Sequence, residues 1–85
     1  MNISYSKNFM AQAKKLSPKV RQKLLEKIEM FAENPLHPML RNHQLKGKWK
    51  EYRSIDVTGG VRALYLQHES EVIFNTVGTH SQLYG

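Results

Sequence analysis

Apolar residues recur at helical spacing in the first half of the chain and alternate with polar residues in the second half. In the early part, Phe9, Ala13 and Leu16 follow one another at intervals of three or four residues. That spacing places them on one face of a helix. Residues 6–16 are therefore expected to form a first helix, preceded by a possible short strand over Ile3 to Tyr5.

A second helix is predicted over residues 18–33. Ser17 is a favourable N-cap, and Pro18 suits the first helical position, where its missing N–H removes no hydrogen bond. The pair Asn34-Pro35 ends the helix, because the residue before a proline is driven out of the α region. Its apolar stripe, expected to face the core, comprises Val20, Leu24, Ile28 and Phe31, widened by Leu25 and Ala32.

Three strands are predicted in the second half, after a proline-containing connection. Residues 49–57 and 61–68 alternate in character with a period of two, and residues 72–77 form a third apolar run. Gly59-Gly60 can take positive φ and turn a hairpin, and residues 69–71 form the next turn. The pattern indicates an α+β fold with an N-terminal helical hairpin packed on a small antiparallel sheet.

Composition narrows the class of protein. Thirteen Lys and Arg against seven Asp and Glu give a net charge of +6, which favours a polyanionic partner. The absence of cysteine excludes a disulfide framework or a thiolate metal site. Apolar runs are too short to span a bilayer, and the first residues lack a signal-peptide pattern. We expect one domain over residues 1–85 in a soluble, cytoplasmic protein.

Positive charge and aromatic rings are interleaved between residues 41 and 53. Cations neutralise phosphates and aromatic faces accept unstacked bases, which suits single-stranded RNA or DNA. Equally, Trp49 can be a core residue and the lysines can protect an edge strand from aggregation. The residues proposed to bind RNA are Arg53, Lys46, Lys48, Lys50 and Trp49.

The four histidines lack the clustered spacing of a metal site, so no metal or other cofactor is predicted. His43 and His80 are better candidates for acid–base work, because an imidazole titrates near neutrality. RNA cleavage needs a base for the 2′-OH, a cation on the phosphate and a ring that fixes the base. Such groups are supplied by Arg53, Arg62, His80 and Tyr84, although Arg62 can instead pair with Asp56 across the hairpin.

Three segments resemble the RelE/ParE superfamily of bacterial toxin–antitoxin systems, and its YafQ-like branch of messenger RNA interferases most of all. They are HQLKGKWKEYRSIDV, GGVRALYL and VGTHSQLYG, within residues 43–85. The resemblance implies a RelE-like toxin domain that cuts messenger RNA in the ribosomal A site without a metal. It also implies a cognate antitoxin and a toxin–antitoxin hetero-oligomer.

The same resemblance assigns roles to individual residues. His80 matches the acid–base residue of the terminal motif, and Tyr84 matches the aromatic residue that stacks on the substrate. His43 matches an active-site histidine, Arg62 the arginine placed on the scissile phosphate, and Arg53 a basic residue of the preceding strand. Leu83 is expected to anchor the tail, with Gly78 permitting a bend and the Thr79 hydroxyl fixing it.

Several family positions carry different residues here. Asp56 stands where the YafQ-like site has a second histidine, Gly59 and Gly60 replace an acidic residue and a tryptophan, and Thr76 replaces an arginine. Asp56 is a candidate replacement base, or a group that orients His43 or His80. Two other functions stay open: a ParE-like inhibitor of DNA gyrase, and an impaired toxin homologue that acts through antitoxin binding.

Overall fold

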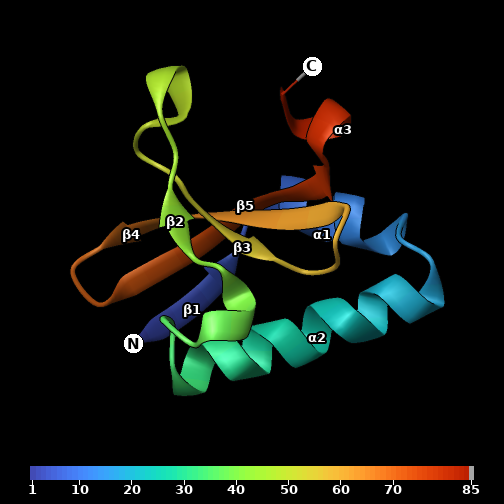
Figure 1. Cartoon of the computed structure of the whole chain (residues 1–85), viewed down its shortest axis with the longest axis horizontal. Coiled ribbons are helices and arrows are strands. Elements are labelled where there is room, and N and C mark those ends of the chain that lie inside the picture. The colour runs from blue at the N-terminus through green and yellow to red at the C-terminus, as the bar shows by residue number, and fades with distance from the viewer. Residues whose placement is uncertain (85) are drawn as a thin grey trace.

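A computed structural model describes residues 1–84 of the chain. Its helices and strands form two layers with additional segments above the sheet (Figure 1). In chain order the elements are β1 (Asn2–Tyr5), α1 (Lys7–Lys14), α2 (Pro18–Glu33), the 3₁₀ turn η1 (Pro38–Leu40), β2 (His43–Gln44), the 3₁₀ turn η2 (Gly47–Trp49), β3 (Arg53–Asp56), β4 (Val61–His68), β5 (Glu71–Thr79) and α3 (His80–Tyr84).

The strands form one five-stranded sheet in the order β1-β5-β4-β3-β2. β3, β4 and β5 are consecutive and antiparallel, so the predicted meander and the α+β class are confirmed. The sheet is mixed, however, because β1 pairs with β5 in parallel. It also gains β2, a strand of two residues that is too short to show an alternating pattern.

Both long helices begin at a serine cap. The Ser6 hydroxyl accepts a hydrogen bond from the Phe9 N–H at 3.0 Å, and the Ser17 hydroxyl accepts one from the Val20 N–H at 3.3 Å. Such caps satisfy amide groups that have no partner inside the helix. α2 runs from Pro18 to Glu33, as its sequence predicts.

α1 completes the edge of β5 beyond the last residue of β1. The Ser6 hydroxyl donates to the Asn75 carbonyl oxygen at 2.9 Å. Gln12 Oε1 accepts from the Val77 N–H and from the Thr76 hydroxyl, each at 2.8 Å. Polar groups that would otherwise lie unpaired at a sheet edge are thereby satisfied by helix side chains.

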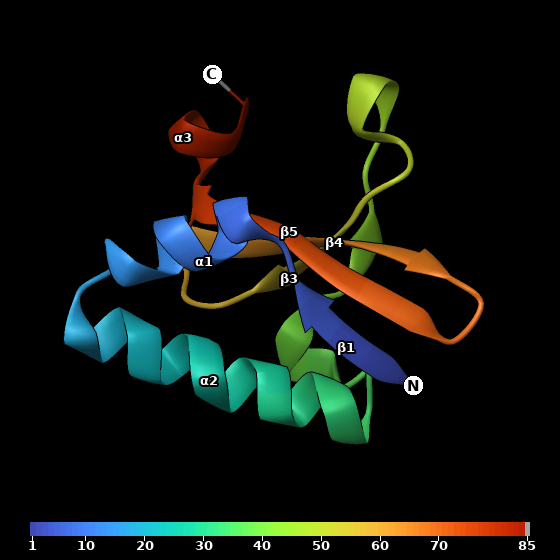
Figure 2. The ribbon, with the colours of Figure 1, turned by 180° about the vertical axis from the view of Figure 1, so that it is seen from behind.

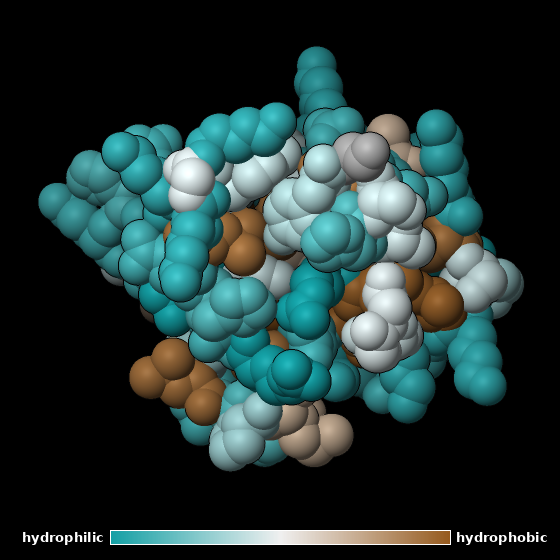
Figure 3. All heavy atoms as spheres, turned by 45° about the horizontal axis from the view of Figure 1, so that its top comes forward, coloured by the Kyte–Doolittle hydropathy of each residue, from teal (hydrophilic) through white to brown (hydrophobic). Residues whose placement is uncertain are grey.

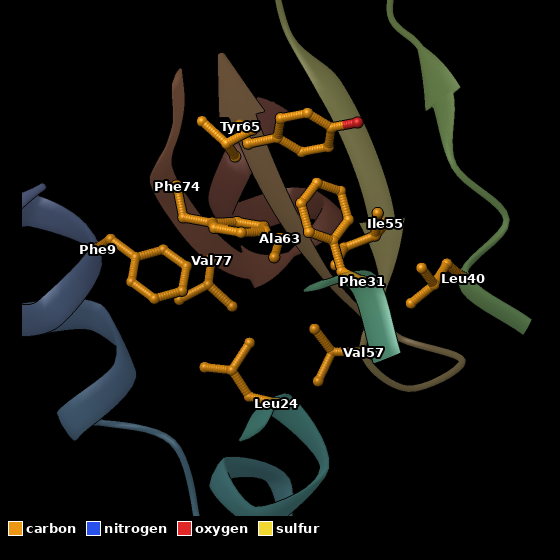
Figure 4. Packing of buried hydrophobic residues seen from close by; sticks show 11 residues of the cluster. Phe9, Leu24, Phe31, Leu40, Ile55, Val57, Ala63, Tyr65, Phe74 and Val77 are labelled. Atoms are coloured by element: carbon orange, nitrogen blue, oxygen red, sulfur yellow. The ribbon is translucent and has the colours of Figure 1, made fainter. Parts of the chain in front are cut away.

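Aromatic rings dominate the core between the helices and the sheet (Figure 4). Phe31 of α2 is fully buried, and its ring centroid lies 4.9 Å from that of Tyr65 and 5.3 Å from that of Phe74. Edge-to-face contacts of this kind add to the free energy gained by burying the rings. The expected widening of the stripe was wrong: Leu25 is 58% exposed and Ala32 is also exposed. Leu25 lies about 100° around the helix from Leu24, outside the buried sector.

The two faces of the sheet are covered differently. α1 and α2 lie on one side, whereas the segment containing β2 and η2 and the segment containing α3 rise from the other side (Figures 1 and 2). We call residues 43–52 the arm and residues 79–84 the tail. The β3–β4 turn falls at Gly59-Gly60 as predicted, but neither glycine takes positive φ. Instead the Thr58 hydroxyl accepts from the Gly60 and Val61 amides and closes the turn.

Candidate functional site

Hydrogen bonds from backbone and side-chain amides stabilise the conformation of the arm. The Leu45 N–H donates to the Tyr52 carbonyl oxygen at 3.0 Å, and Gln44 Nε2 donates to the Lys50 carbonyl oxygen at 2.9 Å. Gly47 has a φ of 66°, in the left-handed region that glycine adopts without strain. These contacts fix the backbone of the arm near Trp49, whose ring contacts the tail.

The tail turns back over the sheet through a capping box at the start of α3. The Thr79 hydroxyl accepts from the Gln82 N–H at 3.3 Å, while Gln82 Oε1 accepts from the Thr79 N–H at 2.8 Å. The expected role of the Thr79 hydroxyl is confirmed. Gly78 acts otherwise than expected: its φ is not positive, but a Cβ there would lie 2.8 Å from Gln82 Oε1. Leu83 is buried and anchors the tail, as predicted.

Between the arm and the tail lies a hollow of about 360 Å³ over the start of β4. Four of the five residues predicted to be catalytic line it: His43 from β2, Arg62 from β4, and His80 and Tyr84 from α3. The rest of its lining comes from the arm, namely Leu45, Lys46 and Trp49. Segments separated by almost forty residues of sequence thus bring imidazole, guanidinium and phenol groups together.

The His43 ring is oriented by the backbone carbonyl group of Arg41, a residue in the left-handed conformation. His43 Nδ1 lies 2.9 Å from the carbonyl oxygen of Arg41, whose φ is 49°. A carbonyl oxygen only accepts hydrogen bonds, so Nδ1 carries the proton in the neutral ring and Nε2 has a free lone pair. This tautomer suits His43 to proton abstraction.

Aromatic rings connect the tail to the arm. The Tyr84 ring meets Trp49 at 5.7 Å and His80 at 4.9 Å between centroids, both edge to face. Burial raises the pKa of the Tyr84 hydroxyl, and the charge of Arg62 lowers it by a smaller amount. Within the described residues this hydroxyl is covered but has no hydrogen-bond partner. Trp49 is half-buried in this cluster and not in the main core.

Asp56 lies beside the hollow and does not line it. Its carboxylate contacts Arg62 Nη1 at 2.5 Å and Arg41 Nε at 3.5 Å. The cross-hairpin pairing with Arg62, one of the two sequence alternatives, is therefore present. The expected contact with His43 or His80 is not among its hydrogen bonds and ion pairs, because the carboxylate is held by arginines.

The predicted RNA-binding residues are divided between different surfaces. Lys46 and Trp49 reach the hollow, and Lys48 Nζ lies 5.9 Å from the centre of the Trp49 ring. Lys50 instead lines a second hollow of about 680 Å³, on the far side of the arm. The side chains of Arg53 and Asp56 point to opposite faces of the sheet, because side chains alternate along β3. Arg53 lies on the helix-covered side, where its Nε donates to Asn42 Oδ1 at 2.9 Å.

Positions where this chain departs from the YafQ-like pattern also lie outside the hollow. Thr76 is buried and hydrogen-bonded to Gln12, and Gly59 and Gly60 are exposed in the β3–β4 turn. Sequence reasoning missed Leu45 in the lining and Gln82 in the tail. The Thr-x-x-Gln spacing of a capping box was the available signal for Gln82.

Residues 1–84 contain neither a cluster of metal ligands nor a membrane-spanning helix. Within that range no three His, Asp or Glu side chains gather where a metal ion would need them. None of the helices there combines the length and apolar character needed to cross a bilayer.

Comparisons with known proteins identify the family and support the fold. The model of the family described as "Bacterial toxin of type II toxin-antitoxin system, YafQ" matches residues 1–85. YafQ from Escherichia coli strain BL21(DE3) has a similar structure, with a TM-score of 0.85, 26% identity, and coverage of 99% of this chain and 98% of that one. No curated protein sequence matches the chain significantly.

Two further solved structures are similar. YafQ in the E. coli DinJ–YafQ toxin–antitoxin complex gives a TM-score of 0.82 at 26% identity, covering 99% of this chain and 97% of that one. A YoeB/ParE toxin from Agrobacterium tumefaciens gives 0.78 at 16% identity, covering 94% and 99%, which supports the fold alone. Because the family model spans the whole chain, the protein belongs to the YafQ family of type II toxin–antitoxin system toxins.

Proposed function

We propose that this toxin is a metal-independent endoribonuclease that cleaves messenger RNA in the ribosomal A site. The observation that carries the proposal is the single hollow lined by His43, Arg62, His80 and Tyr84. Together these groups provide the base, acid and cation that transfer of a phosphodiester to its own 2′-OH requires.

The geometry supports a division of labour between the two imidazoles. His43 Nε2, left free by the Arg41 carbonyl contact, accepts the proton of the 2′-OH. Arg62 neutralises the charge that develops on the phosphate oxygens. His80, exposed on the opposite wall, protonates the leaving 5′-oxygen. Each proton transfer contributes typically 10²- to 10⁴-fold to the rate.

The arm provides the surface for the rest of the RNA strand. Lys46 and Lys48 are exposed beside the half-buried Trp49, so cations and an aromatic face lie next to the hollow. Stacking of a base on an aromatic side chain is worth about 1–3 kcal/mol, and cationic side chains displace counterions from the phosphates. Figure 3 shows this side of the molecule as mostly hydrophilic, with small apolar patches between the polar side chains.

A cognate antitoxin is the second partner that we propose. The E. coli relative is known in complex with DinJ, a toxin–antitoxin pair. This chain has a net charge of +6, which favours an acidic binding segment in the antitoxin. A toxin that acts on ribosomes would work in the cytoplasm.

The decisive experiment maps the 5′ ends of messengers after induction of the parent chain, of His80→Ala and of His68→Ala. His68 is an exposed histidine at the end of β4, outside the hollow, and serves as the matched control. The parent and His68→Ala should cut messengers in register with codons, whereas His80→Ala should cut at least about 100-fold more slowly.

Two other outcomes would replace the proposal. Arrest of DNA supercoiling before protein synthesis would indicate a ParE-like gyrase inhibitor. A parent chain that binds an antitoxin but cuts no RNA would indicate an impaired homologue, an alternative made credible by Asp56 and Thr76 at positions where the family has a histidine and an arginine.

A further inference from the structure

Asp56 and Arg62 form the most buried ion pair of the described residues. They stand directly opposite each other on β3 and β4, and their side chains are 13% and 27% exposed. Arg62 lines the hollow whereas Asp56 does not. The carboxylate therefore holds the guanidinium from outside the site.

We propose that Asp56 is a positioning residue, which acts on the reaction through Arg62 and takes no proton itself. This inference rests on the proposed endoribonuclease function and assigns a role to the residue that replaces the family's second histidine. A planar guanidinium has five N–H donors in a fixed fork. Asp56 occupies Nη1, and the remaining donors are left for the phosphate oxygens.

Holding Arg62 is valuable because its side chain is long. An unrestrained arginine carries about 2 kcal/mol of rotamer entropy, part of which would be lost each time a phosphate bound. A group that is already oriented loses less, and a misplacement of about 1 Å can reduce a rate by about 100-fold. The ion pair accordingly favours both binding of the phosphate and its correct placement for cleavage.

The second carboxylate oxygen extends the network toward His43. Asp56 Oδ2 lies 3.5 Å from Arg41 Nε, and the Arg41 carbonyl oxygen fixes the His43 ring. The Arg41 side chain is 72% exposed, so this pair is weaker than the one with Arg62. Both oxygens thus face guanidinium groups, and the carboxylate does not line the hollow, so it is poorly placed to take a proton from a 2′-OH there.

A double-mutant cycle tests the inference. Single-turnover cleavage is measured for the parent, Asp56→Ala, Arg62→Ala and the double variant. We expect Asp56→Ala to cleave about 10- to 100-fold more slowly and Arg62→Ala about 100- to 1,000-fold more slowly. Because Asp56 acts through Arg62, the double variant should be no slower than Arg62→Ala. Losses that multiply would overturn the inference.

The pH dependence separates positioning from proton transfer. Asp56→Asn keeps an oxygen acceptor of the same shape, so its rate should fall less than that of Asp56→Ala, with the pH–rate profile unchanged in form. A loss of the acidic limb, which reports ionisation of the proton acceptor, or a loss greater than that of Arg62→Ala, would make Asp56 the base and overturn the inference. If Asp56→Ala fails to fold by circular dichroism, Asp56→Asn takes its place in the cycle.

Arg41→Ala is a comparison variant, because it removes the weaker partner of the same carboxylate. We expect a smaller loss than that of Asp56→Ala, since the Arg41 side chain is 72% exposed; a loss as large as that of Arg62→Ala would place the effect outside the Asp56–Arg62 pair. Failure of the two proposals is distinguishable. A parent that cuts no RNA refutes the proposed function, whereas a parent that cuts RNA with multiplicative losses refutes only the role of Asp56.

Discussion

The two faces of the sheet use their side chains in opposite ways. The face toward the helices is filled by aromatic and aliphatic groups, with Phe31, Tyr65 and Phe74 in mutual contact. The opposite face carries Asp56 and Arg62 on neighbouring strands, and the arm and tail stand on either side of a hollow. Alternation along β3 and β4 sends adjacent residues to opposite faces, so each strand serves both.

The difference shows how a small protein separates stability from chemistry. Burial of rings on one face supplies the main favourable free energy. The other side has a buried anchor in Leu83, but it also presents polar groups that are not used for folding, including a Tyr84 hydroxyl that has no hydrogen-bond partner among residues 1–84. Substitutions on the two faces should therefore have separate effects on stability and on RNA cleavage.

Phe31→Ala is expected to give the largest loss of stability. Its ring is fully buried between Tyr65 and Phe74, and such truncations cost about 3–5 kcal/mol. Leu25→Ala, on the same helix but 58% exposed, should change the free energy of unfolding by no more than about 0.5 kcal/mol. Chemical denaturation measures both. Equal losses would show that α2 does not bury the face described here.

Ending the chain after Gln82 should abolish cleavage while most of the fold persists. The truncation removes the buried Leu83 and the ring of Tyr84 from the wall of the hollow. Loss of one buried leucine lowers the free energy of unfolding by about 2 kcal/mol. Circular dichroism and cleavage of messenger RNA test the two parts. A truncated chain that still arrests translation would contradict the prediction.

Tyr84→Phe should have a small effect on stability near neutrality, and the size of that effect should grow with pH. Near neutrality the variant should be as stable as the parent, or up to about 1 kcal/mol more stable, because it removes a covered hydroxyl without a partner among the described residues. Burial raises the pKa of this hydroxyl, so ionisation of the phenol lowers the free energy of unfolding. This loss is absent below the ordinary pKa of 10.0 and grows as pH rises toward the folded-state value.

Thermal unfolding of the parent and of Tyr84→Phe between pH 7 and pH 11 measures this difference. The parent should lose more stability than the variant above about pH 10, where the phenol of an unfolded chain ionises. Tyr5, whose pKa burial also raises, is present in both chains and does not affect the comparison. A variant that is clearly less stable at neutral pH would show that the hydroxyl makes a contact that helps folding.

Local patterns determined much of this protein. Helical spacing located α1 and α2, the Ser17 cap marked the start of α2, and two-residue alternation located β3 and β4, because these signals depend on near neighbours in sequence. The motifs with His43, Arg62, His80 and Tyr84 identified residues that prove to line one hollow. Leu25 shows the limit of such patterns, since the edge of an apolar stripe depends on what packs against it.

Only the tertiary structure determines which residues far apart in sequence lie in contact. The parallel pairing of β1 with β5 and the cap that Gln12 gives β5 join residues more than sixty positions apart. Arg53 and Arg62 are equally cationic in the sequence, yet strand register sends them to opposite faces. The carboxylate of Asp56 meets two arginines and no histidine for the same reason. Sequence specifies the chemical groups, but only the packing of strands, arm and tail determines which of them share a site.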